Sequence, residues 1–587
     1  MYRTHTSGEL RIEHKGQTVT LAGWVQRVRE LGGMTFVDLR DRYGLTQLVF
    51  SDDIDAALNN EVNKLGREYV IQVTGEVLER SAKNSQMPTG EIEIKANELT
   101  VLNAAELPPF IIEDETDGGE ELRMKYRYLD IRRPIMAKTL MLRAKLIKAV
   151  REYLDNLAFV EVETPNLIKS TPEGARDFLV PSRLQNGKFY ALPQSPQILK
   201  QLLMIAGMDR YYQIVKCYRD EDFRGDRQPE FTQIDCEMSF VEQDDVLGTF
   251  EGMIKYAFEK TIEVALPKFI RMTYADAIKY YGTDKPDLRF DCKIVDLNEA
   301  CKGTEFKVFN SALESDKLIA GIVAKGTAGY SRKQIDQLTN FVKEPHRGAG
   351  GMIYLKFNED GTHKSSMDKF LTPEKVAELK AASGAEAGDM LLIIVDKESV
   401  VRKCLGDLRL QLAKQEDWID PKAWSVFWVI DFPLFIEDED TGEFTFAHHP
   451  FCAPHQEDLK YWDTEPLKVR AQTYDLIMNG NELCSGSIRI HDKAMQEKVF
   501  NSLGLSAEDR DNKFGFMLNA FKYGAPPHGG LALGVDRWVM LMIGGNSIRD
   551  VIAFPKSTGG RDLMMDAPSE VPTTALEELG VKLNIKE

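Results

Sequence analysis

The chain has 587 residues, several times the length of a typical domain, so we expect several separately folded regions. Hydrophobic residues make up 43% and charged residues 28%, a globular balance that excludes a largely disordered protein. The net charge of −18 argues against a protein that coats nucleic acid nonspecifically, but it leaves room for local basic patches that hold one RNA.

The sequence shows no sign of membrane insertion or export. No apolar run is long enough to cross a bilayer, and the polar start MYRTHTSGELRIEH carries no secretory signal. The seven cysteines are scattered without a CxxC pair, which fits neither a disulfide framework nor a zinc ribbon. We therefore expect a cytoplasmic protein.

Residues 10–102 contain five strand-like segments with alternating apolar positions, with one helix-like stretch between the third and the fourth. This pattern predicts a small Greek-key barrel. Arg27, Arg29 and Arg40 lie on or near the first strands together with Phe36, and cations beside an exposed aromatic ring suit a single-stranded RNA. A small barrel without an RNA ligand is the alternative.

A Pro-, Gly- and acid-rich stretch that turns basic at KYRYLDIRRP marks a domain boundary. A helical pattern follows, and then long strands flanked by helices, which favour an α+β layer. Residues 291–424 form a separate pattern of strands and helices, after which WSVFWVIDFPLF resumes the long apolar strands. We expect an inserted module there, and the absence of GxGxxG and GxxxxGK[ST] sequences disfavours a dinucleotide or P-loop fold.

Two segments look suited to phosphate groups. Arg219, Asp220 and Glu221 stand at the end of a strand, before a charged loop with further arginines. An isolated pair of this kind is usually a surface ion pair. In PPHGGLALGVDRWVMLM, the glycines allow close backbone approach, and Arg537 begins an apolar helix where its charge needs a partner.

A third cluster is Asp475, Glu482 and Arg489 in YDLIMNGNELCSGSIRIHD. The NGN sequence predicts a hairpin between the two carboxylates, which can then bind Mg²⁺ through oxygen. We infer a bulge at Gly486-Ser487 that turns Arg489 to the face of Glu482. In HHPFCAPH, zinc is an alternative to substrate-facing or structural histidines, but the outlying Cys/His pair is missing.

These segments together resemble the class II aminoacyl-tRNA synthetases, and within them the bacterial aspartyl branch. The likeness covers essentially the whole chain. FVEVETP, with Pro165, resembles the dimer-forming first motif; RDEDFRGDRQPEFTQID resembles the second, and GLALGVDR the third. TPEGARDF resembles the loop that closes over aspartate, and QSPQILKQ the strip that lines its pocket.

The resemblance implies an α+β multidomain fold: an oligonucleotide-binding (OB) barrel, an antiparallel class II catalytic sheet with helices, and an inserted α+β module of the GAD type. The expected regions are an anticodon-binding barrel at 1–104, a hinge at 105–137, catalytic halves at 138–290 and 425–555 around the insertion at 291–424, and a C-terminal extension at 556–587.

The resemblance also implies the site residues. Catalytic roles fall to Arg219, Glu221 and Arg537. Aspartate is expected to contact Glu173, Ser195, Gln197, Lys200, Arg219, Asp235, His448, His449 and Arg489. ATP is expected to contact Arg219, Asp220, Glu221, Gln228, Glu482, Gly534, Val535, Asp536 and Arg537, with Mg²⁺ on Asp475 and Glu482.

The same resemblance implies a homodimer that activates L-aspartate with ATP and transfers it to tRNA(Asp), with no DNA or membrane partner. The anticodon readers are expected to be Arg29, Leu31, Phe36, Gln47, Arg80 and Glu93. Leucine at position 31, where relatives that also charge tRNA(Asn) often have histidine, predicts an enzyme that discriminates against tRNA(Asn).

Several alternatives share part of this pattern. A nondiscriminating enzyme would charge both tRNAs. An asparaginyl enzyme would not normally carry the insertion, a noncatalytic tRNA-binding paralogue would lose motif residues, and an amidotransferase-like enzyme that makes free asparagine would lack the barrel.

Overall fold

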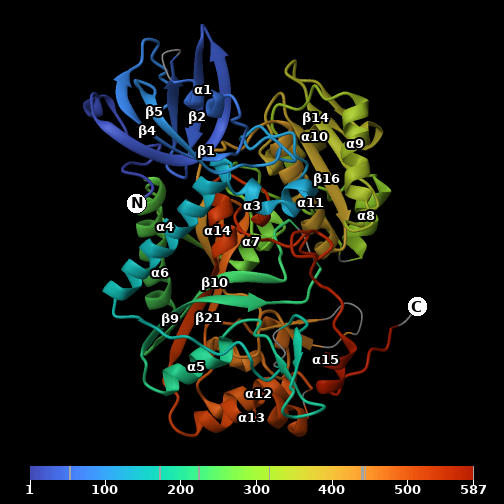
Figure 1. The fold of residues 1–587 in the computed structure, drawn as a ribbon. Coiled ribbons are helices and arrows are strands. Elements are labelled where there is room, and N and C mark those ends of the chain that lie inside the picture. Colours follow the sequence, from blue (N-terminus) through green and yellow to red (C-terminus); the bar gives the residue numbers. More distant parts are fainter. Residues whose placement is uncertain are drawn as a thin grey trace. The chain divides into compact units, whose positions relative to one another are not determined.

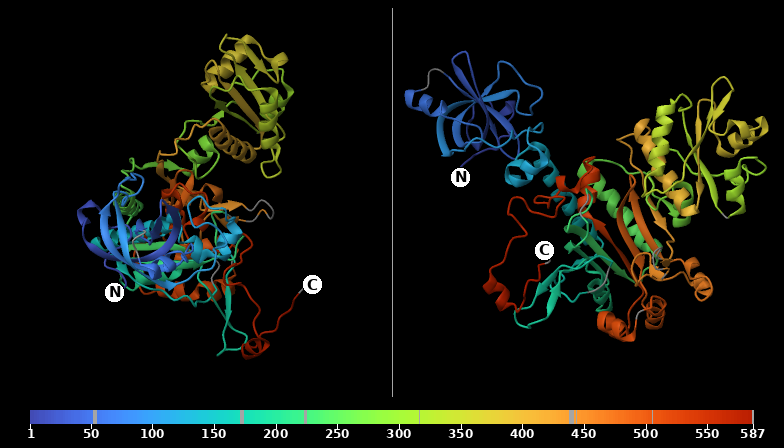
Figure 2. Two further views of the ribbon diagram at one scale, coloured as in Figure 1. Left: turned by 45° about the horizontal axis from the view of Figure 1, so that its top comes forward. Right: turned by 90° about the vertical axis from the view of Figure 1, so that its right-hand side faces the viewer.

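A computed structural model of the chain describes residues 1–51, 55–170, 174–222, 225–315, 317–437, 442, 444–504 and 506–585. The chain divides into two compact units. Unit 1 comprises Met1–Ala144, Phe223–Gln228 and Ser547–Val571, and unit 2 comprises Lys145–Asp222, Pro229–Asn546 and Pro572–Glu587. Figure 1 labels the elements, and Figure 2 gives two further views. Among the described residues, no helix is long and apolar enough to span a membrane.

Unit 1 begins with a closed five-stranded barrel in the order β1-β2-β3-β5-β4. Its strands are β1 (Thr18–Leu31), β2 (Met34–Arg40), β3 (Leu45–Phe50), β4 (Val70–Glu79) and β5 (Ile92–Asn103), preceded by η1 (Ile12–His14). Alternate apolar side chains point inward and form one buried core, as the period of two requires. Helix α1 (Ala56–Val62) lies between β3 and β4. The predicted barrel is confirmed.

The rest of unit 1 is held together by a buried carboxylate. The elements here are α2 (Glu120–Lys125), α3 (Arg127–Asp130), the start of α4 (Pro134–Asn156) and η5 (Ile548–Asp550). Asp130 is fully buried and pairs with Arg127 at 2.5 Å and with Arg133 at 2.7 Å. Arg127 also donates to the carbonyl oxygens of Ile552 and Ala553, so it ties the basic sequence KYRYLDIRRP to the segment after η5.

Unit 2 contains an eight-stranded sheet in the order β11-β17-β20-β21-β22-β10-β9-β6. The strands are β6 (Val160–Glu161), β9 (Arg210–Tyr218), β10 (Glu230–Ser239), β11 (Ile270–Thr273), β17 (Val426–Ile430), β20 (Thr473–Met478), β21 (Asn481–Ile488) and β22 (His528–Gly534). Only the edge pairs β11·β17 and β6·β9 are parallel. The expected antiparallel catalytic sheet is therefore confirmed.

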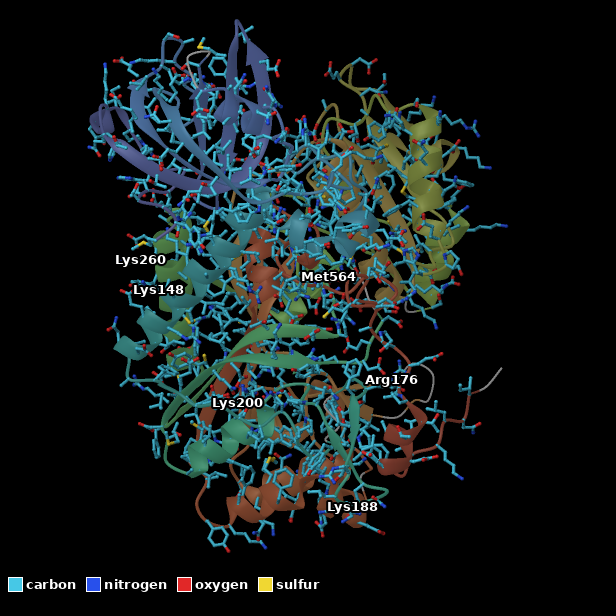
Figure 3. The ribbon with its side chains drawn as sticks, viewed as in Figure 1. Lys148, Arg176, Lys188, Lys200, Lys260 and Met564 are labelled. Carbon is cyan, nitrogen blue, oxygen red and sulfur yellow. The ribbon has the colours of Figure 1, made fainter. Side chains whose placement is uncertain are left out.

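Helices cover both faces of this sheet. On the apolar face, Trp538 of α14 (Val535–Met542) stacks against Phe258 of α6 (Gln243–Ile262), with ring centroids 6.3 Å apart. Trp428 of β17 is fully buried and donates to Glu251 of α6. On the opposite face, Lys200 of α5 (Gln197–Ile205) donates to Asp235 of β10. Figure 1 labels α5 and β10, and Figure 3 labels Lys200.

The insertion builds a sheet of its own in the order β12-β13-β16-β14-β15. Its strands are β12 (Val295–Asp296), β13 (Leu318–Ala324), β14 (Ile353–Phe357), β15 (His363–Ser365) and β16 (Met390–Asp396). Its helices are α8 (Lys307–Glu314), α9 (Arg332–Lys343), α10 (Pro373–Ser383) and α11 (Glu398–Gln415), with η2 (Asp368–Phe370). Two separate cores, one with α9 and α11 and one with α8 and α10, show that helices cover both faces.

Most of the remaining elements of unit 2 are short. They are the β7 (Leu179–Pro181) and β8 (Phe189–Ala191) hairpin, α7 (Tyr274–Tyr281), β18 (Phe435–Glu437), β19 (Phe444–Phe446), η3 (Gln456–Tyr461), η4 (Pro466–Lys468), α12 (Lys493–Ser502), α13 (Ala507–Phe521) and α15 (Thr573–Glu578).

Candidate functional site

One face of the central strands of unit 2 is polar and lined with small residues. Residues directly opposite each other in neighbouring strands share a face, so two rows can be followed across β20, β21, β22, β10 and β9. One row is Asp475, Ser485, Ala532, Asp235 and Gln213, and the next is Thr473, Ser487, Gly530, Glu237 and Tyr211. Serine, alanine and glycine occupy the middle of the rows, between the charged side chains.

The predicted hairpin is present, but the predicted bulge is in the wrong place. Asn479 and Gly480 form the turn between β20 and β21, with φ values of 50° and 75°. Leu476 pairs with Cys484 and Ile477 with Glu482, so the extra residue is Leu483 and not Gly486 or Ser487. Side chains alternate between the two faces of a strand, and the extra residue Leu483 shifts this alternation by one position. Glu482 therefore lies on the same face as Asp475 and Ser487.

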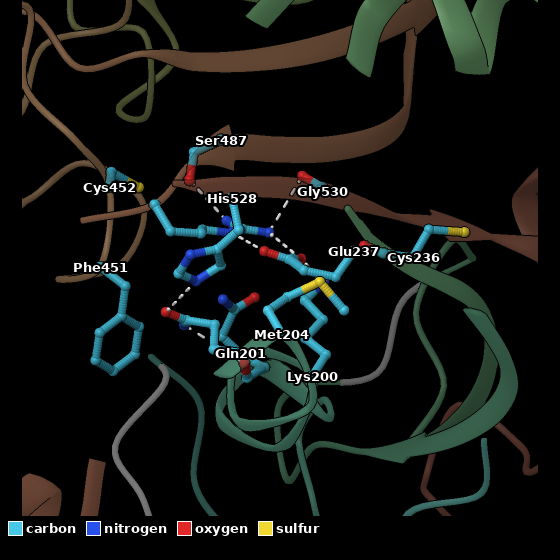
Figure 4. Close-up of polar contacts among 12 residues, drawn as sticks. Lys200, Gln201, Met204, Cys236, Glu237, Phe451, Cys452, Ser487, His528 and Gly530 are labelled. Carbon is cyan, nitrogen blue, oxygen red and sulfur yellow. Dashed lines mark hydrogen bonds and ion pairs between the residues drawn. The ribbon is translucent and has the colours of Figure 1, made fainter. Parts of the chain in front are cut away.

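A buried cluster of two cations and two carboxylates lies at the centre of the polar face. Lys200 Nζ lies 2.7 Å from Asp235 Oδ1 and 3.3 Å from Glu237 Oε2, and Arg489 Nε lies 2.9 Å from Glu237 Oε1. All four side chains are at most 1% exposed. Figure 4 shows Lys200 and Glu237 lying close together in this cluster.

Glu237 was not among the predicted site residues, although its position could have been inferred. In FTQIDCEMS it follows Asp235 by two, the spacing that places both carboxylates on one face of a strand. Burial opposes ionisation of Glu237, but Arg489 and Lys200 hold its pKa below the ordinary value. For Asp235, burial outweighs the attraction of Lys200 and raises the pKa.

All three guanidinium nitrogens of Arg489 donate hydrogen bonds in this arrangement. It donates to Glu237, to Ser487 Oγ at 2.6 Å, to His449 Nε2 at 2.9 Å and to the carbonyl oxygen of Gly530 at 3.1 Å. Gly530 has to be glycine here, because a Cβ would lie 2.2 Å from Glu237 Oε2. The predicted grip of Lys200 and Arg489 is therefore not a pair of free cations, since each is already paired with a buried carboxylate.

The two adjacent histidines have different electrostatic surroundings. Burial together with Arg489 and His448 lowers the pKa of His449 well below the ordinary value, which favours its neutral form. His448 packs edge-on against Phe432 and lies 3.4 Å from Asp475. Burial alone would lower the pKa of His448, but Asp475 and other carboxylates raise it overall.

Asp475 and Glu482 form a carboxylate pair next to His448. Burial and the charge of Asp475 raise the pKa of Glu482 above its ordinary value. Arg537, at the start of α14, donates to the carbonyl oxygen of Glu482, which supplies the partner its charge was expected to need. Across the described part of the chain, no three His, Cys, Asp or Glu side chains are grouped to hold a metal ion, and this includes HHPFCAPH.

Arg219, at the end of β9, lies with its guanidinium carbon 5.1 Å from the centre of the Phe231 ring. Next to it in the sequence, Asp220 forms an isolated antiparallel β-bridge with Arg176, which Figure 3 labels. Gln194, another residue that was not predicted, holds the same loop by exchanging hydrogen bonds with the Ala175 backbone at 3.1 and 2.8 Å. The predicted Glu173 lies outside the described residues.

Other predicted nucleotide contacts have structural partners. Gln228, in unit 1, accepts from Lys556 N at 2.7 Å and donates to Lys556 O at 3.0 Å, so its amide is already paired. Asp536 accepts from the Thr232 backbone at 2.9 Å, and both Asp536 and Val535 are buried. We expect ligand contacts at positions 534–536 to come from the backbone.

Several buried polar atoms of this region have no hydrogen-bond partner. They are Gln197 Nε2, Arg219 Nε, Asp235 Oδ2, His448 Nδ1, Thr473 Oγ1 and Asp475 Oδ1. Five of these six residues were predicted to bind substrates or metal. An unpaired buried polar atom is costly, so such a concentration indicates groups that a ligand satisfies.

The barrel carries a second polar network. Gln47 Oε1 accepts from Arg29 at 3.3 Å and from Arg80 at 3.1 Å, and Gln47 Nε2 donates to Glu93 at 2.9 Å. Phe36 pairs with Arg29 across β1 and β2 and is half-buried. The structure thus brings together four predicted readers and places the Phe36 backbone beside Arg29.

Two further predicted barrel residues are placed differently. Leu31 stands at the tip of the β1–β2 hairpin and is 72% exposed. Arg40, which we expected to join the basic platform, is buried and forms an ion pair with Glu68 at 2.8 Å. Of the three arginines expected on the basic platform, Arg40 is therefore not available at the surface.

Comparisons with known proteins agree with this architecture. The sequence matches the family described as tRNA synthetases class II (D, K and N) over residues 119–558, and an OB-fold nucleic acid binding domain over residues 19–102. It is similar to the aspartate–tRNA ligase of Phocaeicola vulgatus, 57% identical over 100% of both chains. It is also similar to those of Porphyromonas gingivalis, 58% identical over 99% of both, and Flavobacterium psychrophilum, 53% identical over 100% of both.

Solved structures support the fold alone. The asparaginyl-tRNA synthetase of Pyrococcus horikoshii complexed with asparaginyl-adenylate has a TM-score of 0.61 at 19% identity, with 95% of this chain and 99% of that chain covered. The aspartyl-tRNA synthetase of Entamoeba histolytica has a TM-score of 0.57 at 18% identity, with 93% and 89% covered. The family match spans most of the chain and the identities extend over its full length, so the chain belongs to the class II tRNA synthetases of the D, K and N group, in the aspartate–tRNA ligase family.

Proposed function

We propose that the chain activates L-aspartate with ATP, releasing pyrophosphate, and transfers the aspartyl group from the adenylate to the 3′ end of tRNA(Asp). The observation that carries this proposal is the buried cluster of Lys200, Asp235, Glu237 and Arg489 beside unpaired polar atoms. A preorganised set of charges can recognise a small zwitterion without reorganising at the moment of reaction.

Aspartate would lie over the small residues in the middle of the polar face. Lys200 and Arg489 would hold its side-chain carboxylate, with Glu237 keeping both cations in place. Asp235, with Gln197, Ser195 and Glu173, would accept the α-ammonium group. Asparagine would present a neutral amide to the same cations, and a site built for charged hydrogen bonds rejects such an isostere.

The first step joins an α-carboxylate oxygen of aspartate to the α-phosphorus of ATP, while the bond to the pyrophosphate oxygen breaks. Positioning and charge neutralisation are the main contributions available to the protein in such a step. Arg219 would contact the α-phosphate and the attacking carboxylate, Glu221 would orient the adenine, and Arg537 would meet the γ-phosphate. The backbone at 534–536 would add nucleotide contacts.

Asp475 and Glu482 fit a Mg²⁺ site. Asp475 is buried and Glu482 is partly buried, and both supply carboxylate oxygens, the ligand type that Mg²⁺ prefers. Burial and the charge of Asp475 raise the pKa of Glu482, so a cation bound beside the pair would offset an unfavourable negative charge. Bound there together with phosphate oxygens, Mg²⁺ would neutralise the charge on the triphosphate. Arg537, which contacts the Glu482 carbonyl, would hold the hairpin in place for this contact.

We also propose the chain's regional roles. Residues 1–104 would bind the anticodon, 105–137 would act as a hinge, and 138–290 with 425–555 would form the catalytic domain around the insertion at 291–424. Residues 556–587 would form the C-terminal extension. The first motif would join two chains, since Val160, near Pro165, is a 43% exposed apolar side chain on edge strand β6.

The activation step can be tested by ATP–pyrophosphate exchange. We expect exchange that depends on aspartate and is not supported by asparagine, because only aspartate matches the charges of the cluster. Absence of aspartate-dependent exchange in folded protein would exclude the proposal, and equal exchange with asparagine would exclude the proposed role of Lys200 and Arg489.

Replacing Phe36 with alanine should weaken tRNA binding and spare activation. Stacking of one base on an aromatic ring contributes about 1–3 kcal/mol, so we expect the KM for tRNA(Asp) to rise roughly tenfold. ATP–pyrophosphate exchange by the same preparation is the internal control, because it does not require tRNA. An unchanged KM for tRNA would show that Phe36 does not stack on the anticodon.

Purified tRNA(Asn) should be a poor substrate for aspartylation, because the exposed Leu31 side chain offers no hydrogen bond at the tip of β1. Leu31→His should increase aspartylation of tRNA(Asn) relative to tRNA(Asp). The measurement is the ratio of the two kcat/KM values for each variant. Efficient charging of tRNA(Asn) by the unaltered chain would contradict the prediction.

A further inference from the structure

Both connections between the insertion and the central sheet meet the tip of the β20–β21 hairpin. The incoming connection, residues 282–294, contacts the tip through Asp287: a Cβ on Gly480 would lie 3.1 Å from Asp287 Cβ. The outgoing connection, residues 416–425, contacts it through Ser425, whose backbone N donates to Asn479 Oδ1 at 2.8 Å and whose carbonyl accepts from Asn479 N at 2.9 Å. Asn479 Nδ2 adds a donor to Ala423 O at 3.4 Å.

Arg409 of α11 fastens the incoming connection to the insertion. Its side chain donates to the carbonyl oxygens of Asp287 and Cys292, both at 2.9 Å. The guanidinium carbon lies 4.3 Å from the centre of the Phe290 ring and 5.0 Å from that of Tyr281. Asp287, which touches the hairpin tip, is therefore also the residue whose carbonyl oxygen is bound by Arg409 of α11.

The choice of arginine at position 409 is costly for stability alone. Its side chain is fully buried, Nη1 has no hydrogen-bond partner, and burial lowers its pKa. Within the described residues, no carboxylate lies at ion-pair distance from Arg409. An apolar residue of similar volume is often at least as stabilising as a buried charge, so packing by itself does not account for arginine here.

The hairpin held in this way carries the carboxylate pair. Asp475 lies on β20 and Glu482 lies two residues beyond the tip, next to the bulge at Leu483. A shift of the tip would therefore move Glu482 relative to Asp475.

We propose that the insertion positions the Asp475–Glu482 pair through the hairpin tip, with Arg409 and Asn479 as positioning residues on its two connections. The inference rests on the proposed function, in which this pair binds Mg²⁺ with ATP. Neither residue contacts the substrates. Each acts by holding one side of the turn, so that the two carboxylates keep the separation that the metal requires.

The test uses Arg409→Met and Asn479→Gly in the full chain. Glycine tolerates the left-handed conformation of Asn479, so the second variant removes side-chain hydrogen bonds while keeping the turn. The supporting positions of metal ligands typically affect metal affinity by about 10–100-fold, so we expect the Mg²⁺ concentration for half-maximal exchange to rise about tenfold. The KM for aspartate should not change.

Arg347→Met is the matched control. Arg347 is also mostly buried in the insertion, but it pairs with Asp407 at 2.8 Å and with Glu344, all within the insertion. It should leave the Mg²⁺ dependence of exchange unchanged. If Arg409→Met and Asn479→Gly lower only the fraction of active enzyme, with an unchanged Mg²⁺ dependence, the two residues are merely structural and the proposal is wrong.

Hydrogen–deuterium exchange of the substrate-free chain provides a readout that does not depend on catalysis. Backbone amides of residues 476–484 should exchange faster in Arg409→Met and Asn479→Gly than in Arg347→Met. Equal exchange in all three variants would overturn the coupling. Loss of aspartate-dependent activity in the unaltered chain would instead contradict the proposed function, and the amide exchange would still decide whether the insertion holds the tip.

Discussion

Arg489→Leu should abolish aspartate activation while leaving ATP binding in place. Arg489 supplies the fork that holds Glu237 and faces the proposed site of the aspartate side chain. Loss of a buried group that a charged substrate needs reduces kcat/KM by about 10⁴-fold. The measurement is the aspartate dependence of ATP–pyrophosphate exchange, with ATP binding followed separately by calorimetry. Equal losses of ATP and aspartate binding would show that Arg489 only maintains the fold.

The same substitution should also destabilise unit 2, because it leaves Glu237 buried with Lys200 as its remaining cation. Removing one partner of a buried pair costs about 3–5 kcal/mol in the free energy of unfolding. Arg489→Leu combined with Glu237→Leu should recover much of this stability without recovering activity. Arg40→Leu is the matched control, since it breaks another buried pair, with Glu68, in the barrel and should leave the exchange kinetics unchanged.

Arg219→Gln should reduce the rate of activation more than any other change on the nucleotide side of the site. Its guanidinium lies over Phe231, and its buried Nε has no hydrogen-bond partner, so it is placed to meet an anion. Removing one preorganised donor at a centre of developing charge reduces kcat by about 10²–10³-fold. The kcat of ATP–pyrophosphate exchange at saturating aspartate measures this loss.

Arg210→Gln is the control for this second prediction. Arg210 begins the same strand, β9, but donates to the Leu157 carbonyl oxygen, and the change should leave kcat unaltered. If Arg219→Gln raised only the KM for ATP, at constant kcat, Arg219 would bind ground state and transition state equally, and its proposed role at the reacting phosphate would be wrong.

Much of the architecture could be predicted from local patterns. The alternating apolar residues of 10–102 predicted the barrel, and the NGN sequence predicted the β20–β21 turn, because both depend on residues close together in the chain. The bulge could not be located in this way. Its position at Leu483 depends on how β21 pairs with β20, and several positions in NELCSGSI would have satisfied the sequence.

The partners of buried charged residues were even harder to predict from local sequence patterns. Arg489 and Glu237 are 252 positions apart, and no local pattern links them. They meet because β22 lies between β21 and β10, so Gly530 has Ser487 on one side and Glu237 on the other. Arg40 was expected on the basic platform of the barrel, yet it pairs with Glu68. The amide of Gln228 pairs with the Lys556 backbone, and both of these partners lie far away in the sequence.

The sequence by itself therefore determined that a barrel precedes the antiparallel sheet of a class II domain, and which charged residue types gather near the central strands of unit 2. The tertiary structure alone decided which charges are paired, that Lys200 and Arg489 share Glu237, and that the hairpin of Glu482 is held by the insertion's connections. The physical reason is that periodicity and turn chemistry act over a few residues, whereas strand order and burial select partners across hundreds.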